Sequence, residues 1–115
     1  MSLRDRIVKA GMAAQLSMKA VKVWGEDANI RRMTGTERDA FEASIFDASG
    51  KMDKAQFRAK LLVKTLADEA GVRLFTDTEI GVLSELPSDE LVRLYDIAEK
   101  LNGLSKQDVE DLTKN

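Results

Sequence analysis

The side chains that could carry chemistry in this chain are carboxylates and hydroxyls, because its 115 residues include no histidine and no cysteine. The segment from Asp47 to Asp53 has some features of a calcium-binding loop. However, an EF-hand needs glycine at the sixth loop position and a bidentate glutamate at the twelfth. Here Gly50 stands at the fourth position and Arg58 at the twelfth. We therefore expect a polar connection between two helices and no metal site.

The remaining acidic groups have an equally ordinary interpretation. Asp89 and Glu90 stand at an expected helix start, where the helix dipole favours negative charge. The cluster Asp108, Glu110 and Asp111 has no ligand spacing and is typical of a solvated helix face. Without histidine or cysteine, serine–histidine and cysteine–histidine catalysis, disulfides and cysteine-based zinc sites are excluded. We expect a protein that is not an enzyme and has no cofactor.

Composition points to one soluble domain, with 43% hydrophobic and 33% charged residues. No apolar run is long enough to span a bilayer, and charged residues interrupt the N-terminus where a signal peptide would be apolar. Residues 1–65 carry 13 basic and 8 acidic residues, whereas residues 66–115 carry 5 and 12. The two halves thus differ in sign, which is typical of two solvated faces, of opposite ends that meet different partners, or of copies that stack head to tail. The acidic pI of about 5.2 argues against a nucleic-acid partner.

The run from Val23 to Glu42 predicts a hairpin that leads into a surface helix. Strands are expected at residues 19–24 and 28–33, with a turn at Gly25–Asp27. Trp24 is either a contact for a partner or, in the favoured interpretation, a core residue under the hairpin. At least one of Arg31 and Arg32 should face solvent. The residues considered for partner binding are Trp24, Ile30, Arg31, Arg32 and Met33.

The rest of the chain is patterned as helix. Residues 1–18 are expected to form a flexible N-terminal arm with a helical turn or two, and residues 19–115 a single helical domain that starts with the hairpin. Thr34–Glu37 and Thr76–Glu79 are capping-box patterns. The expected helices run from Thr34 to about Gly50, from Asp53 to Leu66, from Thr76 to Leu86, from Ser88 to Leu101 and from Ser105 to about Leu112, with a short extended piece at Val72–Phe75. The predicted fold is mainly α, with about five helices and a short N-terminal β-hairpin, in a single small α+β domain.

The ordered set of these segments resembles the tail assembly chaperones of long-tailed bacteriophages and prophages. The matching segments are Met1–Ile7, Val23–Gly25, Ile30–Glu42 and Leu74–Asp77, and the similarity runs over nearly the whole chain. The resemblance implies a non-catalytic protein of the host cytoplasm, absent from the mature virion. It would bind and solubilise the long helical tape measure protein during tail assembly and associate with itself into rings or spirals.

The resemblance also implies a second, longer product made by ribosomal frameshifting, whose extension recruits the tail tube protein. Thr113-Lys114-Asn115 can be encoded as ACA-AAA-AAC, which contains the slippery heptamer A-AAA-AAC. We expect this or a similar heptamer at these codons. The alternative function is a helical adaptor or regulatory interaction protein of a prophage or another mobile element.

Overall fold

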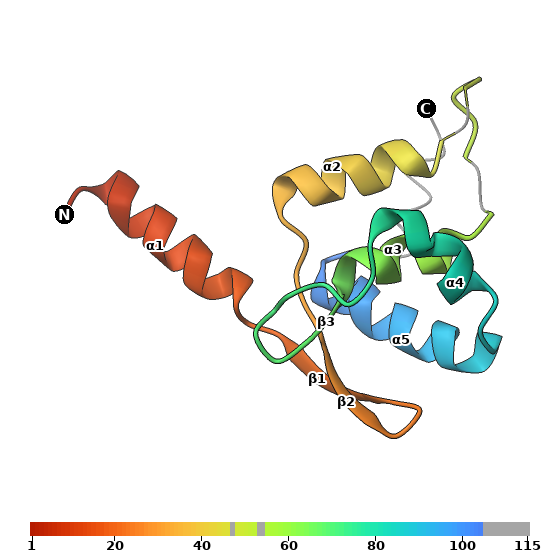
Figure 1. Ribbon diagram of the computed structural model, residues 1–115. Coiled ribbons are helices and arrows are strands. Elements are labelled where there is room, and N and C mark those ends of the chain that lie inside the picture. Colours follow the sequence, from red (N-terminus) through yellow and green to blue (C-terminus); the bar gives the residue numbers. More distant parts are fainter. Residues whose placement is uncertain (47, 53–54, 105–115) are drawn as a thin grey trace.

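The computed structural model describes residues 1–46, 48–52 and 55–104 and shows a small α+β domain with a projecting N-terminal helix (Figure 1). As predicted, the described residues contain five α-helices and an N-terminal hairpin. The helices are α1 (Leu3–Gln15), α2 (Gly35–Ser44), α3 (Phe57–Thr65), α4 (Ile80–Ser84) and α5 (Ser88–Leu101), with a 3-10 turn η1 (Asp77–Glu79) before α4. The five helices include α1, where only a helical turn or two was expected. The expected helix at residues 105–112 lies outside the described residues.

The hairpin consists of β1 (Lys19–Val23) and β2 (Glu26–Ile30), paired antiparallel with Val23 opposite Glu26. The predicted turn at Gly25–Asp27 is wrong, since the turn residues are Trp24 and Gly25 with φ of 46° and 84°. Two-residue hairpin turns with positive φ at both positions match the twist of the strands. The turn therefore begins one residue earlier and ends two residues earlier than predicted, and only Gly25 is common to both.

A third strand, β3 (Leu66–Ala67), pairs antiparallel with β2 and was not predicted. Leu66 had been assigned to the preceding helix, but α3 ends at Thr65. Arg73 forms an isolated antiparallel bridge with Ala67, so the expected extended piece at Val72–Phe75 reaches the sheet edge there. The hairpin is thereby tied to the helical part of the chain, as an isolated two-stranded ribbon requires.

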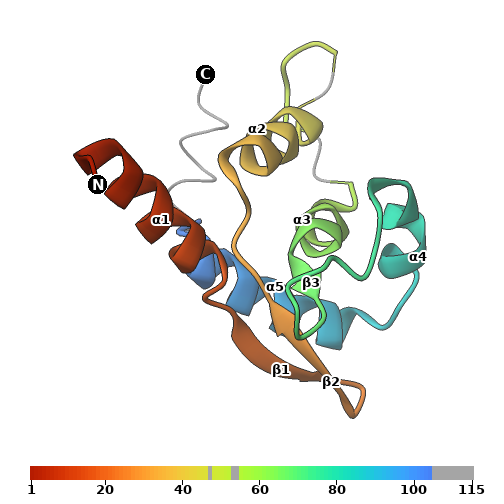
Figure 2. The ribbon, with the colours of Figure 1, turned by 60° about the vertical axis from the view of Figure 1, so that its left-hand side comes forward.

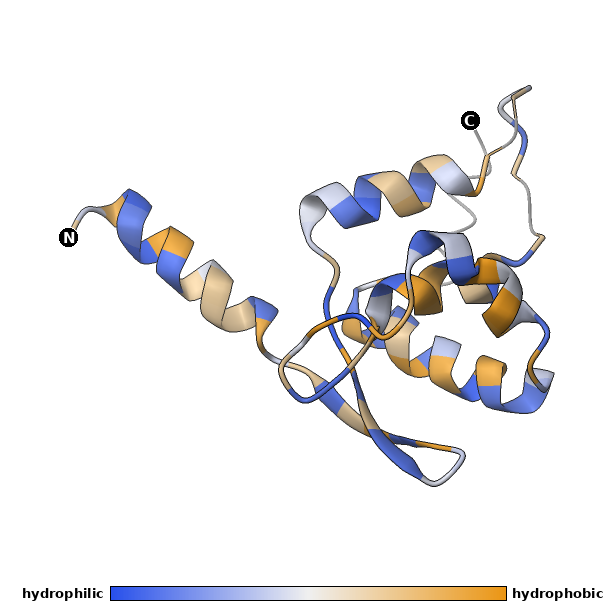
Figure 3. Ribbon diagram, in the orientation of Figure 1, coloured by the Kyte–Doolittle hydropathy of each residue, from blue (hydrophilic) through white to orange (hydrophobic). Residues whose placement is uncertain are grey.

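Helix α3 is the centre of the core. It lies between α2 and α5 in both ribbon views (Figures 1 and 2) and also packs against α4. Five consecutive residues, 61–65, are buried, so α3 is covered on every side and not along one stripe alone. Such a helix depends on packing from several directions. Hydropathy colours agree, with hydrophobic residues gathered on α3 and on the inner sides of α4 and α5 (Figure 3).

Both predicted capping boxes are present. The Thr34 hydroxyl accepts from the amide of Glu37, and the Glu37 carboxylate accepts from the amide of Thr34. Thr76 and Glu79 form the same arrangement at the start of η1. The boundaries of α5 also agree with the prediction, with Pro87 before it and Asn102 after it. The helix after Thr34 is shorter than expected, because α2 ends at Ser44. The expected N-cap Asp53 lies outside the described residues, and the next helix begins at Phe57.

Candidate functional site

Trp24 occupies the tip of the hairpin and is 50% exposed. The favoured interpretation of Trp24 as a core residue under the hairpin is therefore wrong. Its φ of 46° is unusual for a bulky side chain, because the left-handed region is sterically costly for residues other than glycine. The tip thus displays a large aromatic ring from a backbone conformation that ordinary turn residues would adopt more easily.

A polar contact holds the hairpin tip against α5. The Glu90 carboxylate accepts from the backbone amide of Trp24 at 3.3 Å. The same carboxylate pairs with Arg93, and the Arg93 guanidinium donates to the carbonyl of Lys22 on the outer edge of β1. The Arg93 hydrogen bond, and secondarily the Trp24 amide, hold the pKa of Glu90 below its ordinary value of 4.5. Because β1 is an edge strand, the Arg93 side chain also covers the Lys22 carbonyl, which would otherwise be open to pairing with another strand.

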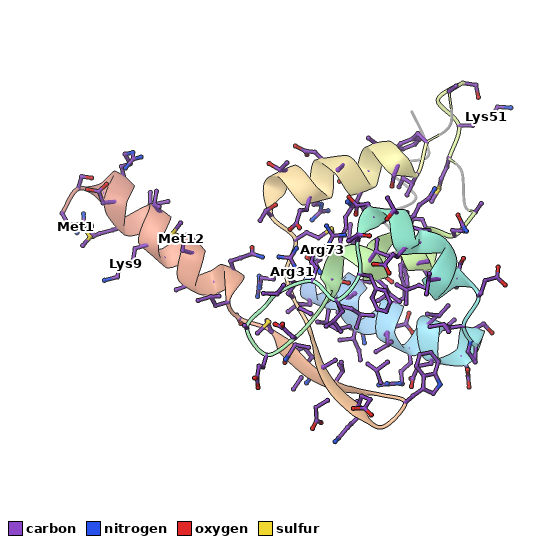
Figure 4. All side chains as sticks on the ribbon, in the orientation of Figure 1. Met1, Lys9, Met12, Arg31, Lys51 and Arg73 are labelled. Carbon is purple, nitrogen blue, oxygen red and sulfur yellow. The ribbon has the colours of Figure 1, made fainter. Side chains whose placement is uncertain are left out.

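Ile30 and Arg31 both make their contacts within the domain. Ile30 is fully buried in the core and offers no surface to a partner. Arg31 donates through Nε to the carbonyl of Lys64 at 3.2 Å and pairs with Glu37. It shares the C-terminal end of α3 with Arg73, whose Nε donates to the Val63 carbonyl at 2.8 Å (Figure 4). Two guanidinium groups thereby satisfy carbonyls at a helix end where positive charge is favourable.

Arg32 and Met33 lie at the base of the hairpin, away from Trp24 along β2. Arg32 is exposed, which agrees with the expectation that one arginine of the pair faces solvent. Met33 is half-buried against the core, and its amide donates to Oδ1 of Asn102 at 2.7 Å. The five candidate residues therefore do not form one surface. Trp24 and Arg32 are accessible at different places on the hairpin, and the other three are wholly or partly enclosed.

Comparisons with protein-family models, curated proteins and solved structures gave no match. In the described part of the chain, none of the helices is long and apolar enough to cross a membrane. Across residues 1–46, 48–52 and 55–104 there is also no group of three or more metal-ligating side chains that could hold an ion. The ends of the calcium-loop-like segment, Asp47 and Asp53, lie outside these ranges.

The most extensive exposed apolar surface is on α1, which sequence reasoning undervalued. The expectation of a helical turn or two without a cap is wrong, since α1 has 13 residues and the Ser2 hydroxyl accepts from the amide of Asp5. None of its residues is buried, and the helix points away from the domain (Figures 1 and 4). Its large apolar residues, all exposed together with the following Leu16, are Leu3, Ile7, Val8 and Met12.

The titratable groups with shifted pKa values all have structural partners. The pKa of Asp77 lies below its ordinary value of 3.8, mainly because the Arg73 guanidinium donates to it, with a further contribution from Lys64. Burial, together with the charge of Glu99, raises the pKa of Tyr95 to about 12. The Tyr95 ring packs against Phe57, with a centroid separation of 5.4 Å, and under the Arg58 guanidinium. Asp77 and Glu90 thus lie in separate ion pairs, and Tyr95 lies in the core.

Proposed function

We propose that this protein is a non-catalytic tail assembly chaperone of the long-tailed phage type, which binds and solubilises a tape measure protein in the host cytoplasm. The observation that carries the proposal is the exposed apolar surface of α1. Large exposed apolar patches on soluble domains commonly mark sites of protein association. The resemblance of the ordered sequence segments supplies the identity of the partner, and the geometry supplies a surface suited to it.

The chemistry of α1 suits a helical client. Ile7 is 62% exposed and Met12 is 69% exposed, and both side chains project into solvent from α1. An amphipathic helix of a partner can bury its apolar stripe against such side chains. Methionine adapts to partners of varied shape, because its side chain is unbranched and polarizable. A client with many similar apolar stripes would thus be covered by repeated copies of one modest contact.

The hairpin tip offers a second contact. The Trp24 backbone amide donates to Glu90 and its side chain is half-exposed, and tryptophan is among the residues that contribute most to binding at interfaces. Under this proposal, α1 and Trp24 contact the client or a neighbouring copy of the chain. The opposite charges of the two sequence halves favour stacking of copies into rings or spirals along the client. A longer, frameshifted product would recruit the tail tube protein, and neither product would remain in the mature virion.

The decisive experiment is co-expression with the tape measure protein encoded beside this gene, with the soluble fraction of that client as the readout. We expect the wild-type chain to keep the client soluble and to co-purify with it. Ile7→Glu combined with Met12→Glu should abolish both effects. Val72→Glu is the matched control, because Val72 is 61% exposed but lies outside α1. All variants should retain the far-ultraviolet circular dichroism of the folded domain, since the altered side chains are exposed.

The outcomes separate this proposal from the adaptor alternative. If the wild-type chain neither binds the client nor raises its solubility, the chaperone assignment is wrong. Binding to a folded regulatory protein through α1, with no effect on the client, would instead identify an adaptor. Equal loss of client binding in the Val72→Glu control would remove α1 as the contact surface while leaving the role itself intact.

A further inference from the structure

A basic cleft lies where the end of the hairpin meets the C-terminal end of α5. Its volume is about 290 Å³. This is at the small end of the range of about 300–1,000 Å³ that is typical of ligand pockets, so it suits a few side chains of a peptide. The lining residues come from three parts of the chain and are Arg32, Met33, Arg38, Lys100, Leu101, Asn102 and Gly103.

Asn102 fixes the shape of this cleft. Its Oδ1 accepts from the amide of Met33 at 2.7 Å, and its Nδ2 donates to the carbonyls of Arg31 and Ala98. One side chain therefore joins the backbone that follows β2 to the last turn of α5. Arg38 closes the cleft from α2 by donating to the Asn102 carbonyl at 2.9 Å. The walls are thus held in place without a ligand.

The charge of the cleft is positive and partly uncompensated. Arg38 also pairs with Glu42 at 3.2 Å. By contrast, Arg32 and Lys100 have no ion-pair partner among the residues that the structure describes, and both are exposed. The backbone carbonyls of Lys100 and Asn102 are already engaged, by the Gly103 amide and by Arg38. The charged side chains that an incoming ligand meets in this lining are therefore all cationic.

The floor of the cleft is apolar. Met33 and Leu101 are half-buried and pack against the core. A ligand that satisfies this site needs negative charge for the rim and an aliphatic group for the floor, because a simple anion would leave the apolar surface in water. The end of α1 lies next to the rim, since Gln15 donates to the Arg32 carbonyl.

We propose that this cleft binds an acidic peptide segment of a partner protein, with a carboxylate between Arg32 and Lys100 and an aliphatic side chain on Met33 and Leu101. The inference is separate from the proposed role of α1, because the lining residues lie outside that helix. It adds a specific, charge-dependent contact to a molecule whose other exposed surface is apolar.

The test uses the full chain, labelled with ¹⁵N, and a capped octapeptide of glutamate and leucine as the probe. Amide signals of Met33, Leu101 and Gly103 should shift on titration. Arg32→Glu and Lys100→Glu should each weaken binding by about tenfold or more, as expected for charges that face a bound carboxylate. Lys19→Glu is the matched control, because it makes the same charge change at an exposed residue outside the cleft, and it should bind like wild type.

Four results would overturn the proposal. They are equal affinity for a glutamine–leucine peptide, equal weakening by Lys19→Glu, shifts confined to α1, and displacement of the peptide by inorganic phosphate at similar concentration. The last would identify a general anion site. The full chain carrying Ile7→Glu and Met12→Glu should still bind the peptide. Loss of client binding by that variant, with the peptide still bound, would separate this cleft from the chaperone surface.

Discussion

The carboxylate of Glu90 accepts a hydrogen bond from the backbone amide of Trp24, which lies 66 positions earlier in the chain. The contact joins the first turn of α5 to the tip of the hairpin. Arg93 extends it, because its guanidinium pairs with Glu90 and also donates to the carbonyl of Lys22. The backbone of the hairpin tip that carries the exposed Trp24 ring is therefore tied to one carboxylate in a distant helix.

Acidification should weaken this attachment. The pKa of Glu90 is lowered in the folded chain, so its contribution to stability is present above its ordinary value of 4.5 and is lost as pH falls through the lower folded value. Asp77 acts in the same direction, below 3.8. Urea unfolding between about pH 7 and about pH 3 should show a smaller acid-dependent loss of stability for Glu90→Gln than for wild type. Glu85→Gln, at an exposed residue three positions before the helix, should keep the wild-type profile, and an unchanged profile for Glu90→Gln would contradict the role of the contact.

Trp24→Asn should separate stability from binding. Asparagine tolerates positive φ, and asparagine followed by glycine is the preferred sequence for this turn. The unfolding free energy should therefore stay the same or rise by up to about 1 kcal/mol, while under the proposed function affinity for the client falls by about tenfold or more. Gly25→Ala is the contrasting change. It should lose about 1 kcal/mol, because Gly25 has φ of 84° although no atom lies within 4 Å of the added methyl group. Unfolding in urea and client pull-down measure the two effects.

Adjacent arginines should behave differently. Arg31→Ala removes the ion-pair partner of Glu37 and the side-chain donor to the Lys64 carbonyl, so we expect a loss of about 1.5–3 kcal/mol of stability. Arg32→Ala should change stability by less than about 0.5 kcal/mol, because its side chain is exposed. Thermal and urea unfolding of the two variants under one set of conditions would check this. Similar values for both would show that Arg31 does not cap α3 in solution.

The single tyrosine reports on the core. Burial raises the pKa of Tyr95 to about 12, so its absorbance titration should have a midpoint well above that of the urea-unfolded chain, at about 10. Since the folded pKa is the higher one, stability is intact below about pH 10 and decreases as pH rises toward 12. Tyr95→Phe removes the signal and preserves the ring contact with Phe57. A folded-state midpoint near the unfolded one would mean that solvent reaches the ring.

Local signals in the sequence predicted the features that depend on neighbouring residues. Each capping box needs only two side chains three positions apart, as at Thr34 and Glu37, and both boxes are present. Helix α5 carries its apolar stripe within its own residues and its stop signal directly after them, at Asn102, so its bounds were predicted as well. The hairpin was predicted, but its turn was misplaced, because a tryptophan with positive φ contradicts the usual preferences of turn residues.

Features that depend on distant residues were missed. Strand β3 exists because Leu66 and Ala67 meet β2 in space, whereas the sequence around them continues a helical pattern. Arg31 precedes α3 in the sequence and Arg73 follows it. The spacing of residues in the sequence therefore could not predict either contact with the end of α3. The apolar surface of α1 was visible as a set of large residues, but its exposure follows from the absence of a packing partner in the described fold. The cleft around Asn102 was also missed, because its lining residues are far apart in the sequence.

The lack of buried residues in α1 has a consequence for its helix–coil equilibrium. A 13-residue helix without tertiary packing is near the length limit for stability in water, which is about 12–15 residues even for favourable sequences. Gly11 lowers helix propensity further, by about 1 kcal/mol relative to alanine. The apparent affinity for a client is then the intrinsic affinity multiplied by the helical fraction of α1. Under the proposed function, Gly11→Ala should strengthen client binding without adding a contact, and the wild-type glycine would keep the complex weak enough for a polymerising tube to displace.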